Sequence, residues 1–439
     1  MIYQVLRNII SFCLNLYYKE IKIKNKKALP KDGPLLIISN HPNTLVDAFV
    51  VGYLCPRPIH FLAKATFFNT SLKRKLLSRL NIVPINRVSD GKTSGIDNND
   101  SFNRCYETLE QGKVIAIFPE GTSFLEHHLR ELKTGAARVI LETVQRNNGN
   151  LKVSVIPVGI NYTEGYKFRS SLLVNIGNPV DYSEEIKIYA DNHSLAARQL
   201  TQKFHDELSS LLISFREKTQ EKLALKLYHI FTSSYIKNDK NGVEKEVELL
   251  RKIQQQLNKI ENETPEKYEE IEISTENLLQ KLNEIELKPS FLDRRIKLRM
   301  FIRQLLFSFI FIILGFPVFI FGIIHNLVIY KCVDTLVPRL TKDIEYYAPL
   351  SILLSMVLYP LVYILFLIAV NQYYNLPVYA DILYFISMPA TGLFAYNFWK
   401  YISHINFKTN FVFYLFRNKN YLEQIKKHRD YLRELVFEK

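Results

Sequence analysis

Short apolar runs alternate with amphipathic helical patterns over the first part of the chain. The expected strands are bounded by polar or turn-forming residues and lie at 34–39, 58–62, 82–85, 113–118, 153–160 and 172–176. Helices with apolar positions three or four apart are expected at 45–54, 66–80, 101–111 and 133–146. This alternation predicts an α/β domain with a mostly parallel sheet over residues 29–182. Ligands of such sheets bind beyond the carboxyl ends of strands, so polar residues at those points are candidates for chemistry.

The next segment, residues 183–300, is predicted to be a helical connector without chemistry of its own. Charged residues recur along it at helical spacing, which is typical of a solvated helix face. A stretch rich in Glu, Lys and Asn at 260–268 predicts a loop within it.

Three runs without Asp, Glu, Lys or Arg follow, at 305–330, 348–380 and 382–399. A helix over the first run is about 39 Å long, more than the roughly 30 Å thickness of a hydrocarbon core. Because Gly315-Phe-Pro317 interrupts that run, it is either one tilted, kinked span or a broken hairpin. Three such runs argue against buried soluble helices, so residues 301–402 are predicted to be α-helical and transmembrane.

Basic residues flank this region on both sides, at 293–303 and in a tail at 403–439. By the positive-inside rule both flanks face the cytosol, which places the α/β domain on the cytosolic side of the membrane. That orientation requires an even number of crossings, so one of the three runs is expected to be a hairpin or to lie in the interface.

The N-terminal segment, residues 1–28, is predicted to be an amphipathic interfacial helix. Apolar positions recur at roughly helical spacing up to Tyr18, and the basic stretch 19–27 follows without a small-residue cleavage site. Such a helix lies in the headgroup region, with its basic collar on anionic lipids. The alternative is a surface helix packed on the next domain.

The charge balance agrees with a phosphate-bearing partner. The chain has 57 Lys and Arg against 43 Asp and Glu, a formal net charge of +14. This favours either nucleic acid or an anionic membrane surface. The uncharged runs favour the membrane, and since no nucleic-acid-binding module is recognisable, no nucleic-acid partner is expected. The four cysteines form no C-x-x-C pair and are interpreted as free thiols.

His41 and Asp47 follow the strand expected at 34–39. An imidazole can take a proton from a hydroxyl, and a carboxylate on its other nitrogen fixes the tautomer and stabilises the imidazolium. Residues six apart do not share a helix face, so the chain must turn between them. Asn43 or Thr44 is then expected to cap the following helix. The alternative interpretation is a capping histidine beside a structural aspartate.

Two cations stand at the ends of neighbouring expected strands. Arg87 follows the strand at 82–85, and its guanidinium matches phosphate oxygens bidentately. Lys64 ends the stretch Phe61-Leu-Ala-Lys64 and is a second cation of the same kind. Both also fit ordinary surface residues at strand ends.

The stretch Phe118-Pro-Glu-Gly-Thr-Ser123 follows the strand at 113–118. Gly121 permits a close backbone approach to a ligand, and Glu120 with the hydroxyls of Thr122 and Ser123 faces the same corner. The carboxylate is expected to bind substrate hydroxyls or to support a neighbouring arginine, unless it is simply solvated. The helix that opens at 133–138 can hold an anion at its N-terminus. A fourth stretch, 155–162, is expected to form an acyl-facing wall.

Together these stretches resemble the glycerolipid acyltransferase family, which includes lysophosphatidate and glycerol-3-phosphate acyltransferases. The pairing of Asn40-His-Pro42 with Phe118-Pro-Glu-Gly-Thr-Ser123 carries the resemblance. It implies that His41 is the general base, that Asp47 orients it, and that Arg87 holds the acceptor phosphate. Glu120 and Gly121 would complete the acceptor pocket, with Thr122, Ser123 and Lys64 as further substrate-binding candidates.

The resemblance also implies the partners of the reaction. These are an acyl thioester donor (acyl-CoA or acyl-carrier protein), a phosphorylated glycerol or lysophospholipid acceptor, and the bilayer. No cofactor and no metal are expected, and no G-x-S-x-G elbow suggests an acyl-enzyme. Five residues separate His41 from Asp47, where the family usually has four. This departure is similar to that of the fungal glycerol-3-phosphate acyltransferases, so the acceptor stays open between glycerol-3-phosphate and a lysolipid.

Two motifs do not contribute to this interpretation. Gly91-Lys-Thr-Ser94 resembles the end of a phosphate-binding loop, but the glycine that such a loop needs five residues earlier is Asn86. His127 and His128 form a pair without further metal ligands in the sequence. The alternative to an enzyme is a catalytically silent membrane scaffold that keeps the acyltransferase fold.

Overall fold

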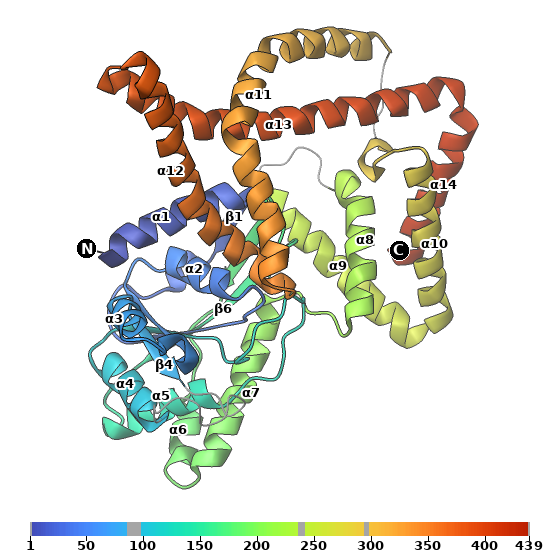
Figure 1. The fold of residues 1–439 in the computed structure, drawn as a ribbon. Helices are drawn as coiled ribbons and strands as arrows, with labels where there is room; N and C mark the ends of the chain where they lie inside the picture. Colours follow the sequence, from blue (N-terminus) through green and yellow to red (C-terminus); the bar gives the residue numbers. More distant parts are fainter. Residues whose placement is uncertain (1, 86–97, 236–241, 294–297, 438–439) are drawn as a thin grey trace. The chain divides into compact units, whose positions relative to one another are not determined.

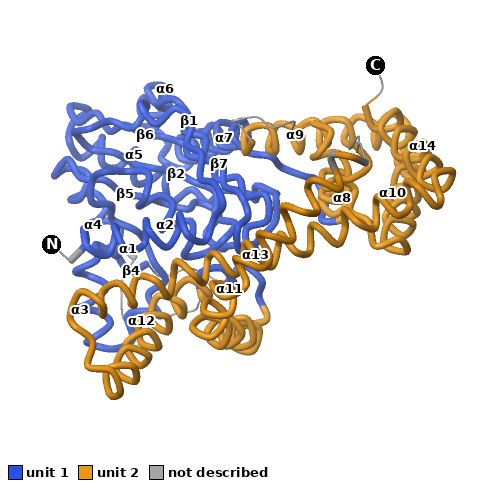
Figure 2. Tube along the Cα trace, turned by 90° about the horizontal axis from the view of Figure 1, so that it is seen from above, with its two compact units in different colours: residues 1–218, 343–349 blue, residues 219–342, 350–439 orange. Residues whose placement is uncertain are grey.

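A computed structural model of the chain describes residues 2–85, 98–235, 242–293 and 298–437. Their contacts divide them into two units, which are described separately (Figure 2). Unit 1 comprises Met1–Lys218 and Asp343–Pro349, and unit 2 comprises Thr219–Lys342 and Leu350–Lys439.

Unit 1 is built on one seven-stranded sheet of order β1-β7-β6-β2-β5-β3-β4 (Figure 1). The strands are β1 Glu20–Lys24, β2 Leu35–Ser39, β3 Ile59–Lys64, β4 Ile82–Ile85, β5 Val114–Ile117, β6 Ser154–Tyr162 and β7 Ser171–Ile176. Every neighbouring pair is parallel except β6 and β7, which are antiparallel. The predicted α/β fold with a mostly parallel sheet is therefore confirmed.

The centre of this sheet is fully buried. Strand β2 lies between β5 and β6, and Leu35, Leu36, Ile37 and Ile38 are all 0% exposed. A continuous apolar run is what a parallel strand covered on both faces requires. One core cluster joins alternate residues of β2, β5 and β6 to helices α4, α5 and α7. The helices of unit 1 are α1 Ile2–Tyr17, α2 Leu45–Leu54, α3 Ser71–Arg79, α4 Asn98–Glu110, α5 Gly135–Arg146, α6 Ser183–Tyr189 and α7 His193–Leu211.

The prediction for residues 1–28 is corrected in part. The helix ends at Tyr17, and Glu20–Lys24 forms β1, which pairs with β7 at the edge of the sheet. In this strand Ile21 and Ile23 alternate with lysines, a period-two pattern that the basic composition of the segment concealed. The helix expected at 66–80 is also divided, into the short 3-10 helix η2 (Ala65–Phe68) and α3.

Unit 2 contains only helices in the part of the chain that the structure describes. They are α8 Lys218–Tyr235, α9 Gly242–Glu263, α10 Pro265–Glu284, α11 Leu298–Leu340, α12 Tyr347–Tyr374, α13 Val378–Arg417 and α14 Lys419–Val436. The loop predicted at 260–268 is wrong, since Thr264 alone separates α9 from α10. Pro265 takes the first helical position, where its missing N–H costs nothing.

Three helices of the described chain are long and apolar enough to cross a membrane: Phe301–Leu340, Ile344–Tyr374 and Val378–Arg417. Helix α11 is continuous through Pro317, as a single span requires, and the break that a hairpin needs at this point is not observed. Helix α13 runs beyond residue 402, the predicted end of the membrane region. Helices α11 and α13 approach each other closely at Gly322. A Cβ at this position would lie 2.3 Å from the Thr391 carbonyl oxygen, so only glycine fits there.

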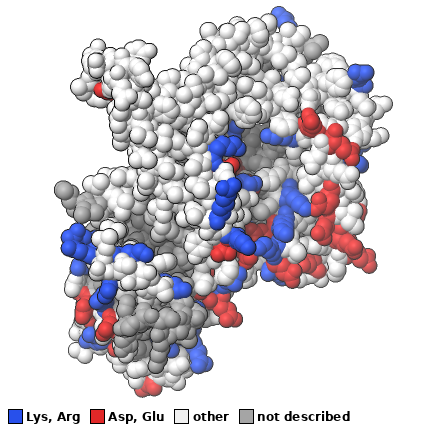
Figure 3. Space-filling model, viewed as in Figure 1, with Lys and Arg blue, Asp and Glu red and all other residues white. Residues whose placement is uncertain are grey.

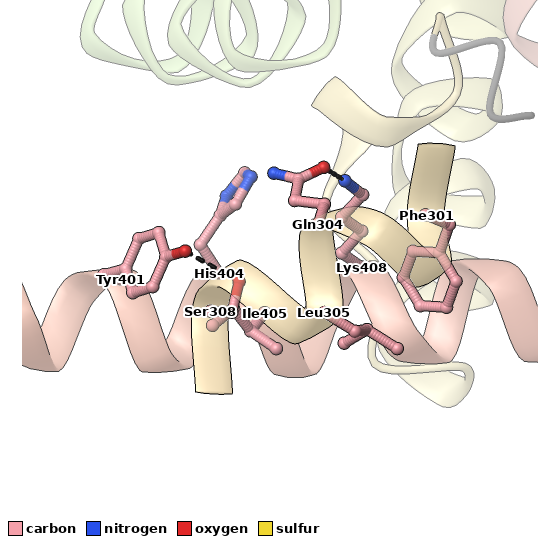
Figure 4. Close-up of a pocket in the computed structure, with 8 residues that line it drawn as sticks. All are labelled: Phe301, Gln304, Leu305, Ser308, Tyr401, His404, Ile405 and Lys408. Atoms are coloured by element: carbon pink, nitrogen blue, oxygen red, sulfur yellow. Dashed lines mark hydrogen bonds between the residues drawn. The ribbon is translucent and has the colours of Figure 1, made fainter. Parts of the chain in front are cut away.

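A small hollow lies between the first turns of α11 and the last turns of α13 (Figure 4). Tyr401 and Ser308 hydrogen-bond through their hydroxyls at 2.7 Å, and Lys408 donates to Gln304. The cavity volume is about 20 Å³, which is room for about one water molecule. The hollow is therefore too small for a substrate.

Candidate active site

The structure brings His41 and Asp47 together at the carboxyl end of β2. Strand β2 ends at Ser39, and α2 places Asp47 in its first turn. The Nδ1 atom of His41 lies 2.9 Å from Oδ2 of Asp47. The His41 side chain is 16% exposed and that of Asp47 is 0% exposed. The carboxylate is therefore removed from water while the imidazole still reaches the surface.

Three donors surround the buried Asp47 carboxylate. Besides His41 Nδ1, the Asn43 backbone N–H donates to Oδ2 at 2.7 Å and the Tyr162 hydroxyl donates to Oδ1 at 2.7 Å. Burying a carboxylate is costly unless it is hydrogen-bonded, and these three donors meet that need. Burial, and then the charge of Asp47, raises the pKa of Tyr162 well above its ordinary value, so its hydroxyl remains a donor.

The imidazole plane is fixed by an aromatic neighbour. Phe118 stacks on His41 with ring centroids 4.2 Å apart and an angle of 12° between the rings. Because Nδ1 faces Asp47, Nε2 is the nitrogen that can accept a proton from a hydroxyl. A His–Asp pair in this arrangement has the geometry of a general base with its orienting carboxylate.

Glu120 binds main-chain groups on both sides of the site. Its Oε1 accepts from the His41 backbone N–H at 2.7 Å, and its Oε2 accepts from the Arg130 backbone N–H at 3.3 Å. The side chain is buried, and burial raises the pKa of this carboxyl. Glu120, in the turn after β5, is thus bonded to the main chain of the loop that carries His41.

The turn at Gly121 carries a cation that the sequence did not single out. Gly121 has φ +76, and a Cβ built on it would lie 3.1 Å from three atoms of the Lys133 side chain, Nζ included. The Lys133 backbone N–H donates to the Pro119 carbonyl at 2.8 Å, which holds the two segments together. Helix α5 begins two residues later without a side-chain cap from Thr134, so its first N–H groups stay available to an anion.

The remaining predicted residues are placed as follows. Thr122 is exposed and Ser123 is half-buried in the turn after Gly121. Lys64 is the last residue of β3, and its partner across the ladder is Ile85, the last residue of β4. Arg87 lies outside the described residues, as does the stretch Gly91–Ser94.

Tyr162, Phe118 and Asn43 are the members of the site that sequence reasoning missed. Tyr162 ends β6, in the stretch that was expected to form only an acyl-facing wall. Its position at a strand end was the available signal, because the carboxyl ends of β2 and β6 meet at one edge of the sheet. Asn43 or Thr44 was expected to cap α2, but Thr44 makes no capping hydrogen bond and the Asn43 amide donates to the Gly165 carbonyl instead.

The histidine pair 127–128 bonds to main-chain carbonyls. His127 Nε2 lies 2.6 Å from the backbone carbonyl oxygen of Tyr162. His128 Nδ1 lies 2.9 Å from the backbone carbonyl oxygen of Phe215. Among the residues that the structure describes, no group of three or more His, Cys, Asp or Glu could hold a metal ion.

Comparison with known proteins gives the class of this site. The acyltransferase family model matches residues 20–161, which include every site residue that the sequence indicated up to Ser123. The matched segment is similar to acyltransferase domains, and the relatives that match it are named as glycerolipid acyltransferases. The matched segment contains the strands and loops that carry His41, Asp47 and Glu120, so the predicted resemblance is confirmed.

Three relatives illustrate the match of the acyltransferase domain. Glycerol-3-phosphate O-acyltransferase 1 of Saccharomyces cerevisiae is 33% identical over 21% of this chain and 12% of its own length. A probable 1-acyl-sn-glycerol-3-phosphate acyltransferase of Mycoplasma genitalium is 29% identical over 39% of this chain and 61% of its own. The chloroplastic 1-acyl-sn-glycerol-3-phosphate acyltransferase of Arabidopsis thaliana is 29% identical over 32% of this chain and 36% of its own length. The chain spans less than two thirds of each relative.

Proposed function

We propose that the protein is a membrane-bound O-acyltransferase of phospholipid synthesis. It moves a fatty acyl group from an acyl thioester to a hydroxyl of glycerol-3-phosphate or of a lysophospholipid such as 1-acyl-glycerol-3-phosphate. The observation that carries the proposal is the His41–Asp47 pair at 2.9 Å, at the carboxyl edge of the sheet within the segment that the acyltransferase model matches. The names of the relatives support both acceptors, and three membrane-length helices suit lipid substrates.

In the proposed reaction His41 Nε2 removes the proton of the acceptor hydroxyl as its oxygen attacks the thioester carbonyl. The C–S bond then breaks, and the thiolate leaves with the proton that the imidazolium returns. Asp47 holds Nδ1–H in place and stabilises the imidazolium in the transition state. The acyl group passes directly to the acceptor, so no acyl-enzyme forms.

The acceptor phosphate is proposed to bind beside the Gly121 turn. Lys133 lies along Gly121, and the uncapped N-terminus of α5 follows it. Arg87 is proposed as a further phosphate ligand on the basis of the family resemblance, and Lys64 because it ends the strand β3. Thr122 and Ser123 offer hydroxyls at the same turn for hydrogen bonds to the acceptor.

The basic flanks of the apolar helices support a cytosolic location of the acyltransferase domain. Cysteines substituted at exposed sites of unit 1 in intact cells test this orientation. They are expected to resist a membrane-impermeant thiol reagent until the membrane is opened, and rapid labelling of intact cells contradicts it.

The decisive experiment is acyl transfer by the purified full-length chain in detergent, with each acceptor paired with acyl-CoA and with acyl-carrier protein as donor. His41→Ala is expected to abolish transfer while its circular dichroism spectrum matches that of the wild type. A catalytically silent scaffold predicts no transfer by the wild type with any pair. Full activity of the His41→Ala variant rules out the proposed base.

A further inference from the structure

Helix α3 has no buried residue. Leu72 is 76% exposed and Leu76 is 54% exposed, and Phe67, just before the helix, is 57% exposed. Large apolar side chains are scattered singly over most soluble surfaces, whereas several exposed within one short segment favour a binding surface. A helix of this length is also marginal in water on its own. Something outside the described residues of unit 1 is therefore expected to cover this helix.

The exposed leucines of α3 lie between cations. Leu72 and Leu76 are one turn apart and share a helix face. Lys73, Arg74, Lys75 and Arg79 surround them, and α3 contains no acidic residue. Among the described residues none of these four cations pairs with a carboxylate, and Figure 3 shows Lys and Arg side chains gathered where Figure 1 draws α3. An apolar stripe flanked by unpaired cations matches the chemistry of an anionic lipid surface.

We propose that α3, together with Phe67, is an interfacial membrane-binding helix of the acyltransferase domain. Leu72, Leu76 and Phe67 enter the boundary between headgroups and acyl chains, while the lysine and arginine side chains extend to the lipid phosphates. The proposal commits to a lipid surface because the same chain has three membrane-length helices, which hold its polar parts next to a bilayer.

A second feature of unit 1 agrees with this occupant. Helix α1 buries Leu14 but exposes Val5, Ile9 and Phe12, which lie on one face of that helix. Figures 1 and 2 both draw the start of α1 and α3 on the same side of unit 1. Two separate segments with exposed apolar side chains thus lie on that side of unit 1.

The position of α3 in the chain gives this contact a consequence for the site. The short helix η2, which contains Phe67, follows directly on Lys64 at the carboxyl end of β3. His41, Glu120 and Gly121 stand at the same edge of the sheet. Docking Phe67 and α3 on the bilayer brings this edge to the lipid surface, from which a lipid acceptor can enter.

Tryptophan quenching in the full-length chain tests the proposal. Trp399 is the only tryptophan, so Trp399→Phe provides a silent background for Leu76→Trp. The matched control is Leu195→Trp on α7, an exposed leucine (45%) on another helix of unit 1. Both variants are reconstituted in vesicles of equal parts phosphatidylcholine and phosphatidylglycerol, with and without acyl chains brominated near the headgroup.

The expected result is a blue-shifted emission at position 76 that brominated chains reduce to less than half, with no change at position 195. Equal quenching at the two positions overturns the proposal. A blue shift at position 76 without quenching also overturns it, because protein rather than lipid then covers α3. The measurement needs no acyl transfer, so its failure is distinct from failure of the proposed function.

A second arm tests the role of the cations. Lys73→Glu, Arg74→Glu and Lys75→Glu are combined in the Leu76→Trp background. Quenching in the mixed vesicles is expected to be lost, and the unmodified helix is expected to lose most of its quenching in pure phosphatidylcholine. If quenching is unchanged both in the triple Glu variant and in pure phosphatidylcholine vesicles, the assignment to anionic lipid is overturned.

Discussion

The hydroxyl of Tyr162 donates a hydrogen bond to Asp47 Oδ1 at 2.7 Å, on the opposite carboxylate oxygen from His41. Both side chains are buried, and they come from segments 115 residues apart in the chain. The group that orients the candidate base is thus itself fixed by the last residue of β6. Loss of this one hydroxyl should disturb catalysis without removing any residue that touches substrate.

We therefore predict that Tyr162→Phe lowers kcat/KM by about tenfold or more, as expected for a hydrogen bond to a charged group. Without this donor the carboxylate attracts the imidazolium more strongly, so the acidic limb of the pH–rate profile moves to higher pH. The check is kcat/KM against pH. Tyr182→Phe is the matched control, since its hydroxyl bonds the Val153 carbonyl; it should change stability but not the profile. An unmoved acidic limb in Tyr162→Phe contradicts the assignment.

Asp47→Asn is predicted to remove on the order of 10³-fold or more of the activity. An amide offers one acceptor oxygen, whereas the Asp47 carboxylate accepts from His41, Asn43 and Tyr162. If the amide NH₂ faces His41, the imidazole is held in the tautomer that cannot accept a proton at Nε2. Single-turnover rates at saturating donor and acceptor measure this loss. Activity within a few-fold of the wild type would refute the orienting role.

Glu120→Gln is predicted to change how stability depends on pH. Burial raises the folded-state pKa of Glu120 above its ordinary value of 4.5, so ionisation is less favourable in the folded protein than in the unfolded chain. The contribution of Glu120 to stability is therefore full below pH 4.5 and declines as pH rises through the raised value. The Tm of the wild type minus that of the variant, followed against pH in detergent, should fall across this window and then level off. A difference that rises with pH would contradict the sign.

Much of the acyltransferase domain could be predicted because its signals are local. A parallel strand such as β2 is a continuous apolar run, and a motif residue such as Glu120 directly follows a strand end. The contact between His41 and Asp47 was also within reach, since one turn joins them. Strand β1 was missed because its lysines dominate the composition, and its pairing with β7 is visible only in the fold.

The rest of the site depends on contacts between distant segments. Nothing near Tyr162 in the sequence indicates that its hydroxyl meets Asp47, because β6 enters the sheet beside β2 only through tertiary pairing. The same holds for Lys133, which reaches Gly121 across the turn after β5. In unit 2 the composition at 260–268 indicated a loop. Thr264 alone separates α9 from α10, and Pro265 then begins α10.

Lys133→Met is predicted to raise KM for the phosphorylated acceptor by about tenfold, with kcat little changed. The side chain lies along Gly121, so its ammonium reaches the same turn as Thr122 and Ser123. Lys152→Met is the control, because Lys152 precedes the amino end of β6 and its loss should leave KM unchanged. The measurement is KM for acceptor at saturating donor. Equal KM values in both variants would exclude Lys133 from the acceptor site.

Thr44 is predicted to stabilise, through its hydroxyl, the loop between β2 and α2 that carries His41. It is one of the five residues between His41 and Asp47, and it adopts φ 42 and ψ −121, which is strained for a β-branched residue. Its Oγ1 donates to the Glu345 carbonyl at 3.2 Å, within unit 1. Thr44→Val keeps the strain but loses this hydrogen bond, so unfolding should become easier by about 1 kcal/mol.

Thr44→Ser keeps the hydroxyl and is the matched comparison. Its expected stability is within about 0.5 kcal/mol of the wild type, because a serine can still reach Glu345. Denaturant unfolding in detergent, monitored together with acyl transfer, separates the two variants. Activity should fall with stability in Thr44→Val, since the same loop carries the imidazole. Equal stability of Thr44→Ser and Thr44→Val would show that the hydrogen bond to Glu345 does not stabilise the strained turn.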